Sequence, residues 1–182
     1  MAIGIIVAIV LVILFYVLTT YNGLVGSKNI VDEAFSTMDV YLKKRWDLIP
    51  NLVETVKGYA KHESETLEKV IALRNGAYNN MSVDEKMEVN KQLSSGISKL
   101  IAVAESYPDL KANQNFTDLS KELSKIEEDI ANSRKYYNGT VRNFNNKVMM
   151  FPGNIVANMF GFKKANMFEA AEEEKKNVKV EF

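Results

Sequence analysis

Hydrophobic side chains follow two different patterns along this sequence, one continuous and one periodic. Residues 1–18 are all apolar or glycine, and the first charged side chain is Lys28. From residue 21 onward, apolar side chains recur every three or four positions, which is the spacing of one face of an α-helix. Prolines stand only at 50, 108 and 152, so long uninterrupted helices are allowed. Together with the lack of strand-like alternation, this pattern predicts an all-α protein.

The continuous apolar run predicts a transmembrane anchor over residues 1–20. An α-helix rises ~1.5 Å per residue, so about 20 such residues cross the ~30 Å hydrocarbon core of a bilayer. A cleaved signal peptide and a buried core helix are the alternatives. A signal peptide needs a basic residue before the run and a small-residue cleavage site after it, and residues 18–22 form a poor site.

Three amphipathic helices are predicted after the anchor. The first carries an apolar stripe that passes Pro50 almost in phase, which favours a kink over a turn there, and it is expected to close at Asn75-Gly76. The second opens at a capping-box pattern, Ser82-Val-Asp-Glu85, and ends at Tyr107-Pro108. The third begins near Thr117 and ends before Phe151-Pro152.

Connections at 76–81 and 107–116 are short, so neighbouring helices are expected to be antiparallel. The prediction is an elongated antiparallel bundle of three to four long helices over residues 21–162, with coiled-coil-like seams, followed by a charged tail at 163–182. A helix continuous through Pro50 gives three legs and places residues 149–162 far from the membrane. A turn at Pro50 gives four legs and places them beside it.

Many short blocks of the sequence resemble the LemA family, and together they cover essentially the whole chain beyond the anchor. The most specific is the run Arg-Trp-Asp-Leu-Ile-Pro-Asn-Leu at 45–52. Further blocks lie at 21–25, 34–35, 42–44, 53, 56–63, 72–74, 107–113, 116, 119, 122–123, 126–127, 130–131, 134, 137–138, 141, 145, 151–152, 157, 161–162, 168–169 and 180–182.

The resemblance implies a bacterial-type, single-span membrane protein with a helical domain and no established catalytic activity. It also implies a role in envelope or heat-stress responses or in membrane remodelling, and a neighbouring membrane zinc metalloprotease as a possible partner. The family is described with its N-terminus outside and its domain in the cytoplasm. The basic residues that follow the anchor are Lys28 and, further along, Lys43, Lys44 and Arg45, and they favour the same orientation in the cell membrane.

Composition removes several classes of site. The chain has no cysteine and one histidine, which excludes disulfides, thiolate metal sites and any site that needs two imidazoles. Its 23 basic and 23 acidic side chains balance, which argues against nucleic-acid binding. A single histidine can supply neither the paired imidazoles of a zincin nor those of a di-iron bundle, so no metal is expected. No phosphate-binding glycine loop is present, and no cofactor is expected.

Two groups of side chains are candidates for a special role. Arg45, Arg74, Glu127 and Arg134 flank apolar stripes, and we expect a partly buried ionic network that sets the register of the bundle. Independent surface charges are the alternative.

The second group is an apolar surplus near the end of the chain, which either closes the bundle or stays exposed for a partner, another copy or lipid. It consists of Met149, Met150, Phe151, Ile155, Met159, Phe160 and Phe162.

These features predict an anchored scaffold or interaction protein without catalysis, with the bilayer, other proteins or a second copy of itself as partners. A carboxylate-based metal-binding or enzymatic bundle is the alternative from a different class, and a membrane-shaping lipid binder is a third.

Overall fold

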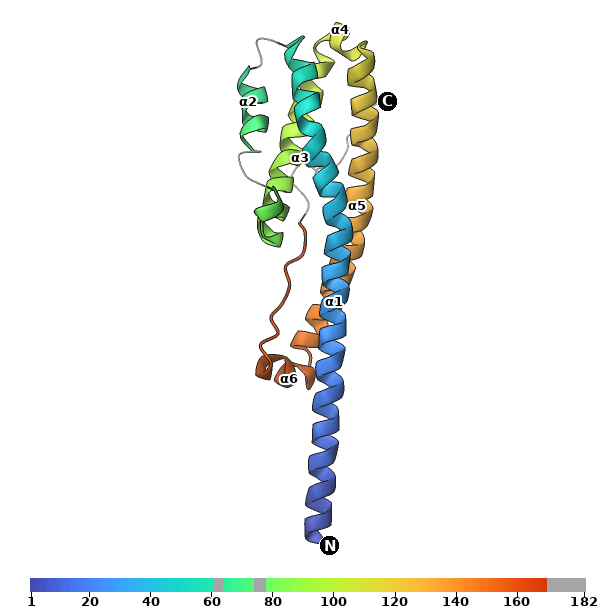
Figure 1. Ribbon diagram of the computed structural model, residues 1–182, viewed down its shortest axis with the longest axis vertical. Helices are drawn as coiled ribbons and strands as arrows, with labels where there is room; N and C mark the ends of the chain where they lie inside the picture. Colours follow the sequence, from blue (N-terminus) through green and yellow to red (C-terminus); the bar gives the residue numbers. More distant parts are fainter. Residues whose placement is uncertain (61–63, 74–77, 170–182) are drawn as a thin grey trace, which may run out of the picture. The chain divides into compact units, whose positions relative to one another are not determined.

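All regular elements in the described part of the chain are helices, which confirms the predicted fold class. The computed structural model describes residues 1–60, 64–73 and 78–169. The elements in order are α1 (Ala2–Lys57), α2 (Ser64–Ala72), the 3-10 turn η1 (Tyr78–Asn80), α3 (Val83–Glu105), α4 (Pro108–Lys111), α5 (Gln114–Met149) and α6 (Gly153–Met159) (Figure 1).

Helix α1 continues through Pro50 without a turn, as the in-phase stripe predicted. A proline inside a helix costs about 3 kcal/mol or more, because it removes a backbone hydrogen bond and crowds the preceding turn. The residues on either side offset this cost by burial: Leu48, Ile49, Leu52 and Val53 are all in the core. Packing of this apolar stretch therefore outweighs the local preference of proline.

The predicted end of the first helix is wrong. α1 ends at Lys57, and Ser64–Ala72 form a separate helix, so the stripe beyond Val56 belongs to α2. Gly58 is a poor helix former, and it follows the last helical residue directly. The amides of Tyr59 and Ala60 both donate to the Val56 carbonyl, at 3.0 and 2.9 Å, which closes the helix. The expected stop at Asn75-Gly76 lies outside the described residues.

Of the two predicted helix caps, the one at the start of α3 is correct and the one at the start of α5 is not. Ser82 and Glu85 form the expected capping box: the Glu85 amide donates to Ser82 Oγ at 3.3 Å, and the Ser82 amide donates to Glu85 Oε2 at 2.7 Å. The predicted start at Thr117 is three residues too late. Asn113 is the residue that caps α5, since its Oδ1 accepts from the Phe116 amide at 3.1 Å.

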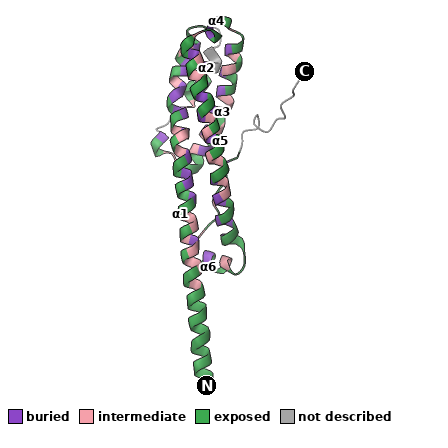
Figure 2. Ribbon diagram, turned by 90° about the vertical axis from the view of Figure 1, so that its right-hand side faces the viewer, coloured by how far each residue is buried: buried purple, intermediate pink, exposed green. Residues whose placement is uncertain are grey.

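The chain divides into two compact units. Unit 1 comprises Met1–Thr37 and Ser133–Met167, and unit 2 comprises Met38–Asn132 and Phe168–Phe182. In unit 1, α1 and the second part of α5 lie side by side and run antiparallel (Figures 1 and 2). The rings of Phe35 and Tyr137 meet edge to face there, with centroids 5.8 Å apart.

The core of unit 2 is built from α1, α3 and α5. Met38, Leu42 and Ile49 of α1 are buried in it, as are Leu93 of α3 and Ile130 of α5. Helix α2 packs on α3.

Candidate functional site

A completely buried arginine lies in the middle of unit 2. The Arg45 side chain is 0 % exposed and comes from the apolar face of α1, between Leu42 and Ile49. One guanidinium nitrogen, Nη1, donates to Glu127 Oε1 at 2.8 Å and Oε2 at 3.0 Å, and to Ser94 Oγ at 2.9 Å. The other, Nη2, donates to both the carbonyl and Oδ1 of Asn90 at 2.8 Å. A charge out of water is tolerated only when it is paired and hydrogen-bonded in this way.

The structure brings together two of the four residues of the expected ionic network, Arg45 and Glu127. Arg134 is half-buried and belongs to unit 1, and Arg74 lies outside the described residues. The sequence interpretation missed the two α3 partners, Asn90 and Ser94. Asn90 stands on the α3 stripe between Met87 and Leu93, and a polar residue at a core position is a signal that could have identified it.

A second polar cluster joins α1, η1 and α3. Asp39 accepts a hydrogen bond from the Tyr78 hydroxyl at 2.7 Å through Oδ1, and its Oδ2 lies 2.6 Å from Lys86 Nζ. The same ammonium group lies 4.7 Å from the centre of the Tyr78 ring. Burial, and then the hydrogen bond to the Asp39 carboxylate, raise the pKa of the Tyr78 hydroxyl above its usual range. Sequence reasoning did not single out any of these three residues.

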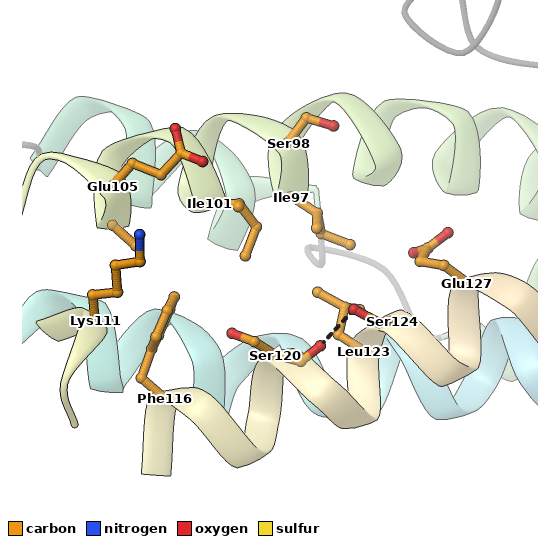
Figure 3. A pocket seen from close by; sticks show the side chains of 11 residues that line it. Ile97, Ser98, Ile101, Glu105, Lys111, Phe116, Ser120, Leu123, Ser124 and Glu127 are labelled. Atoms are coloured by element: carbon orange, nitrogen blue, oxygen red, sulfur yellow. Dashed lines mark hydrogen bonds between the residues drawn. The ribbon is translucent and has the colours of Figure 1, made fainter. Parts of the chain in front are cut away.

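A cavity of about 710 Å³ opens between α3, α4 and α5 in unit 2 (Figure 3). Its apolar wall includes Ile97, Ile101, Phe116 and Leu123. Figure 3 shows Glu105 and Lys111 at one end and Glu127 at the other.

Three serines, Ser98, Ser120 and Ser124, complete the polar part of the lining. Ser124 Oγ is close to the Ser120 backbone in Figure 3, and no histidine or cysteine is among the lining residues to activate a hydroxyl. The cavity thus combines an apolar wall with a Glu127 carboxylate that is already engaged by Arg45.

The alternative of a carboxylate-based metal site finds no cluster to carry it in the part of the chain that the structure describes. Within residues 1–60, 64–73 and 78–169, no three histidine, aspartate or glutamate side chains gather as metal ligands would. The single histidine, His62, lies outside these ranges.

The predicted apolar patch is exposed except for Phe162, which is half-buried. Phe151 and Met150 are 79 % and 65 % exposed, and Met149, Ile155, Met159 and Phe160 are also exposed. The expected position of the patch is wrong. With α1 continuous through Pro50, we expected the patch far from the anchor, yet in unit 1 the Phe160 ring lies 4.7 Å from that of Tyr21. The error lies in the predicted number of legs of the bundle, because the sequence reading had merged α2 with the first helix.

The first part of α1 has the properties expected of a membrane span. Among the described helices, α1 is the one that is long and apolar enough to cross a bilayer, and none of its most apolar window is buried. Figure 2 shows this stretch as exposed ribbon, and every residue from Met1 to Tyr16 is exposed. Such exposure argues against a core helix, because an apolar face without a protein neighbour needs another apolar medium.

The fold and these features define a class: an all-helical protein in which a bare apolar helix continues into a bundle with a buried ionic centre. The chain belongs to the LemA family, whose family model matches residues 34–182.

Relatives of known name support this assignment. Protein LemA of Metamycoplasma hominis is 30 % identical over 159 residues, which cover 86 % of this chain and 72 % of that protein. Magnetosome protein MamQ 2 of Paramagnetospirillum magneticum is 22 % identical over 178 residues, covering 84 % of this chain and 65 % of the relative. Magnetosome protein MamQ of Magnetospirillum gryphiswaldense is 21 % identical over 177 residues, with 83 % and 65 % covered.

Proposed function

We propose that this chain is a membrane-anchored helical scaffold of the LemA type, which works by binding other proteins or further copies of itself and not by catalysis. The observation that supports this most strongly is the bare apolar stretch of α1, which is continuous with the helix that carries Arg45. One helix thus provides both the proposed membrane span and a core helix of the bundle. A partner bound to the bundle is thereby held at the membrane.

The buried ionic centre supports a structural role for the bundle. The Arg45 guanidinium links α1 with α3 and α5 through hydrogen bonds, two of which pair it with the Glu127 carboxylate. Both oxygens of the Glu127 carboxylate accept from Arg45 Nη1, so this carboxylate serves to join α5 to α1. The arrangement favours rigidity over chemistry.

The orientation of the anchor is part of the proposal, with the bundle in the cytoplasm. Two of the lysines that follow the span are paired with acids one turn away, Lys28 with Asp32 and Lys43 with Asp47. The positive-inside rule counts the basic residues near the span and not the net charge, so the pairing of Lys28 does not remove its contribution to the bias.

Crosslinking mass spectrometry in native membranes, with and without heat stress, tests the proposal. The scaffold role predicts crosslinks from bundle lysines to other proteins, such as a membrane protease, or to a second copy of the chain. Isotope-mixed chains separate crosslinks between copies from those within one chain. Intrachain crosslinks alone under both conditions would contradict the proposal. A role in stress responses predicts that partner crosslinks increase on heating.

A further inference from the structure

The turn after α5 and the short helix α6 carry an unusually apolar surface. Residues 148–162 contain no charged side chain, while Lys147 precedes them and Lys163 and Lys164 follow. Within α6, Val156 and Ala157 are buried and Ile155 and Met159 are exposed, so the helix hides one apolar face and presents another. We call the exposed set the α6 patch: Met149, Met150, Phe151, Ile155, Met159 and Phe160.

Contacts within unit 1 fix the level of the α6 patch along α1. The rings of Phe160 and Phe162 lie 4.7 and 5.8 Å from the Tyr21 ring. A Cβ atom built on Gly153 would stand 4.0 Å from Thr20 Cγ2, so α6 begins directly against this turn of α1. Both views of the ribbon show α6 beside α1 (Figures 1 and 2).

The same turn of α1 marks the edge of the bare apolar stretch. Side chains before Val17 are all exposed, and Leu24 is the first buried residue of the helix. The hydrocarbon core takes about 20 residues of helix, so a span over residues 1–20 ends at Thr20 and Tyr21. The α6 patch therefore lies at the depth where acyl chains give way to headgroups.

From this coincidence of level we propose that the α6 patch is a second membrane contact, which rests in the lipid interface beside the transmembrane helix. The inference depends on the proposed anchor, and it names lipid as the occupant of the patch. Lipid surrounds a single span on every side, so it reaches any exposed side chain at this depth without a dedicated partner. Aromatic residues favour this zone, and lysines at its edge extend their ammonium groups toward headgroups.

The contact is an apolar insertion more than an electrostatic adhesion. Phe151 and Met150 project from the turn, and Ile155 and Met159 follow one helical turn apart. Lys147, on the protein side, is already engaged with Ser27 Oγ and the Gly23 carbonyl. This internal tie holds the end of α5 against α1 and keeps the turn at the bilayer surface. The anchor and the α6 patch together would restrain the tilt of unit 1 relative to the membrane.

Depth-dependent fluorescence quenching tests the proposal on the full chain. The sequence has no cysteine, so single-cysteine variants need no prior substitution. Phe151→Cys and Ile155→Cys report on the patch, and Ile9→Cys reports on the anchor. Tyr136→Cys is the matched control, since Tyr136 is 61 % exposed on α5 of the same unit, well before the turn. Each variant carries a nitrobenzoxadiazole label in phosphatidylcholine vesicles at less than one chain per vesicle.

Spin-labelled lipids are expected to quench the probes at 9, 151 and 155 several-fold more than the probe at 136. Quenching at 9 but not at 151 or 155 would overturn the second contact and leave the anchor intact. Absence of quenching at 9 would instead overturn the anchor itself. A label at 151 that becomes shielded from water only when each vesicle holds several chains would assign the patch to contact with a second copy. That result would also overturn the proposal.

A label-free variant guards against disturbance by the fluorophore. Phe151→Trp keeps an aromatic ring at the most exposed site of the patch, and the natural Trp46 is buried in unit 2, where it gives a constant background. The added tryptophan is expected to emit at shorter wavelength in vesicles and to be quenched by brominated lipids. Tyr136→Trp is the control, because its added tryptophan is exposed to water. A Phe151→Trp variant that emits at the same wavelength as Tyr136→Trp in vesicles, and is quenched no more by brominated lipids, would contradict the lipid contact.

Discussion

The Arg45 guanidinium, fully shielded from solvent on α1, lies 2.8 Å from the Glu127 carboxylate on α5, 82 residues away in sequence. The same guanidinium reaches Asn90 and Ser94 of α3. One side chain thus fixes three helices of unit 2 relative to one another. A buried ion pair of this kind adds little net stability compared with apolar residues of the same size, but losing one partner is costly.

Replacement of Glu127 by alanine is expected to destabilise unit 2 by about 3 kcal/mol, the low end for breaking a buried pair, because the carboxylate is partly exposed. The cost arises from the buried Arg45 charge that remains. Chemical unfolding of the full chain in detergent measures it. Glu128→Ala is the matched control on the exposed surface and should change the unfolding free energy by less than about 0.5 kcal/mol. Equal effects of the two substitutions would refute a structural role for the pair.

The double variant Arg45→Met with Glu127→Leu is expected to regain most of the stability that Glu127→Ala loses. It removes both charges, and the remaining cost is the loss of the hydrogen bonds that Arg45 donates to Asn90 and Ser94. If Arg45 sets the register, the double variant should also show altered crosslinks between α1, α3 and α5 although it is stable. Wild-type crosslinks in a stable double variant would show that apolar packing alone sets the register.

Stability is expected to fall at alkaline pH through Tyr78. Its pKa is raised in the folded state by burial and by the hydrogen bond to Asp39, so the folded chain holds the proton more tightly than the unfolded chain. The resulting stabilisation is present below the usual tyrosine pKa of 10.0 and is lost as pH rises above it. Tyr78→Phe should flatten the decline in unfolding midpoint between pH 9 and 11. Tyr136→Phe, on the exposed surface, should leave the decline as it is.

The capping box of α3 predicts a loss of stability at acid pH. The Glu85 carboxylate accepts the Ser82 backbone amide, and this hydrogen bond, followed by that of the Ser82 side chain, lowers the pKa of Glu85 below its usual 4.5. The stabilisation is therefore present above that value and is lost as pH falls through the lowered pKa. Glu85→Gln should reduce the pH dependence of thermal unfolding below pH 5, whereas Glu88→Gln on the exposed face should not.

Two glycines of unit 1 are expected to respond oppositely to alanine. A Cβ on Gly153 would lie 2.9 Å from the Lys147 carbonyl oxygen, so Gly153→Ala must displace the turn and should destabilise unit 1. Gly139 lies within α5 with no neighbour within 4 Å of a new Cβ, and Gly139→Ala should stabilise by up to about 1 kcal/mol through helix propensity. Thermal unfolding of both variants decides. A stabilising Gly153→Ala would show that the turn is not tightly packed.

The sequence predicts most helices because their buried stripes are local and periodic. The continuity of α1 through Pro50 followed from the phase of that stripe, and the α3 cap from Ser82 and Glu85. The end of α1 was missed because the stripe resumes in phase in α2, while the signal of Gly58 is a single weak propensity.

The candidate site was predictable only in part. Arg45 and Glu127 attract notice because each flanks an apolar stripe, but their pairing depends on the register of two helices that no local pattern reports. Asp39, Tyr78 and Lys86 come from three separate elements and carry no shared motif. The level of the α6 patch likewise required the contacts of Tyr21 with Phe160.

The central claim is that the chain is anchored by an uncleaved N-terminal helix. The most direct test is mass spectrometry of membranes that have been washed with alkaline carbonate. The wash strips peripheral proteins and leaves spanning helices in place. The account predicts that the chain stays in the membrane pellet and that peptides from residues 1–20 are recovered with it. Release into the supernatant of a chain that lacks residues 1–20 would identify a cleaved signal peptide and contradict the account.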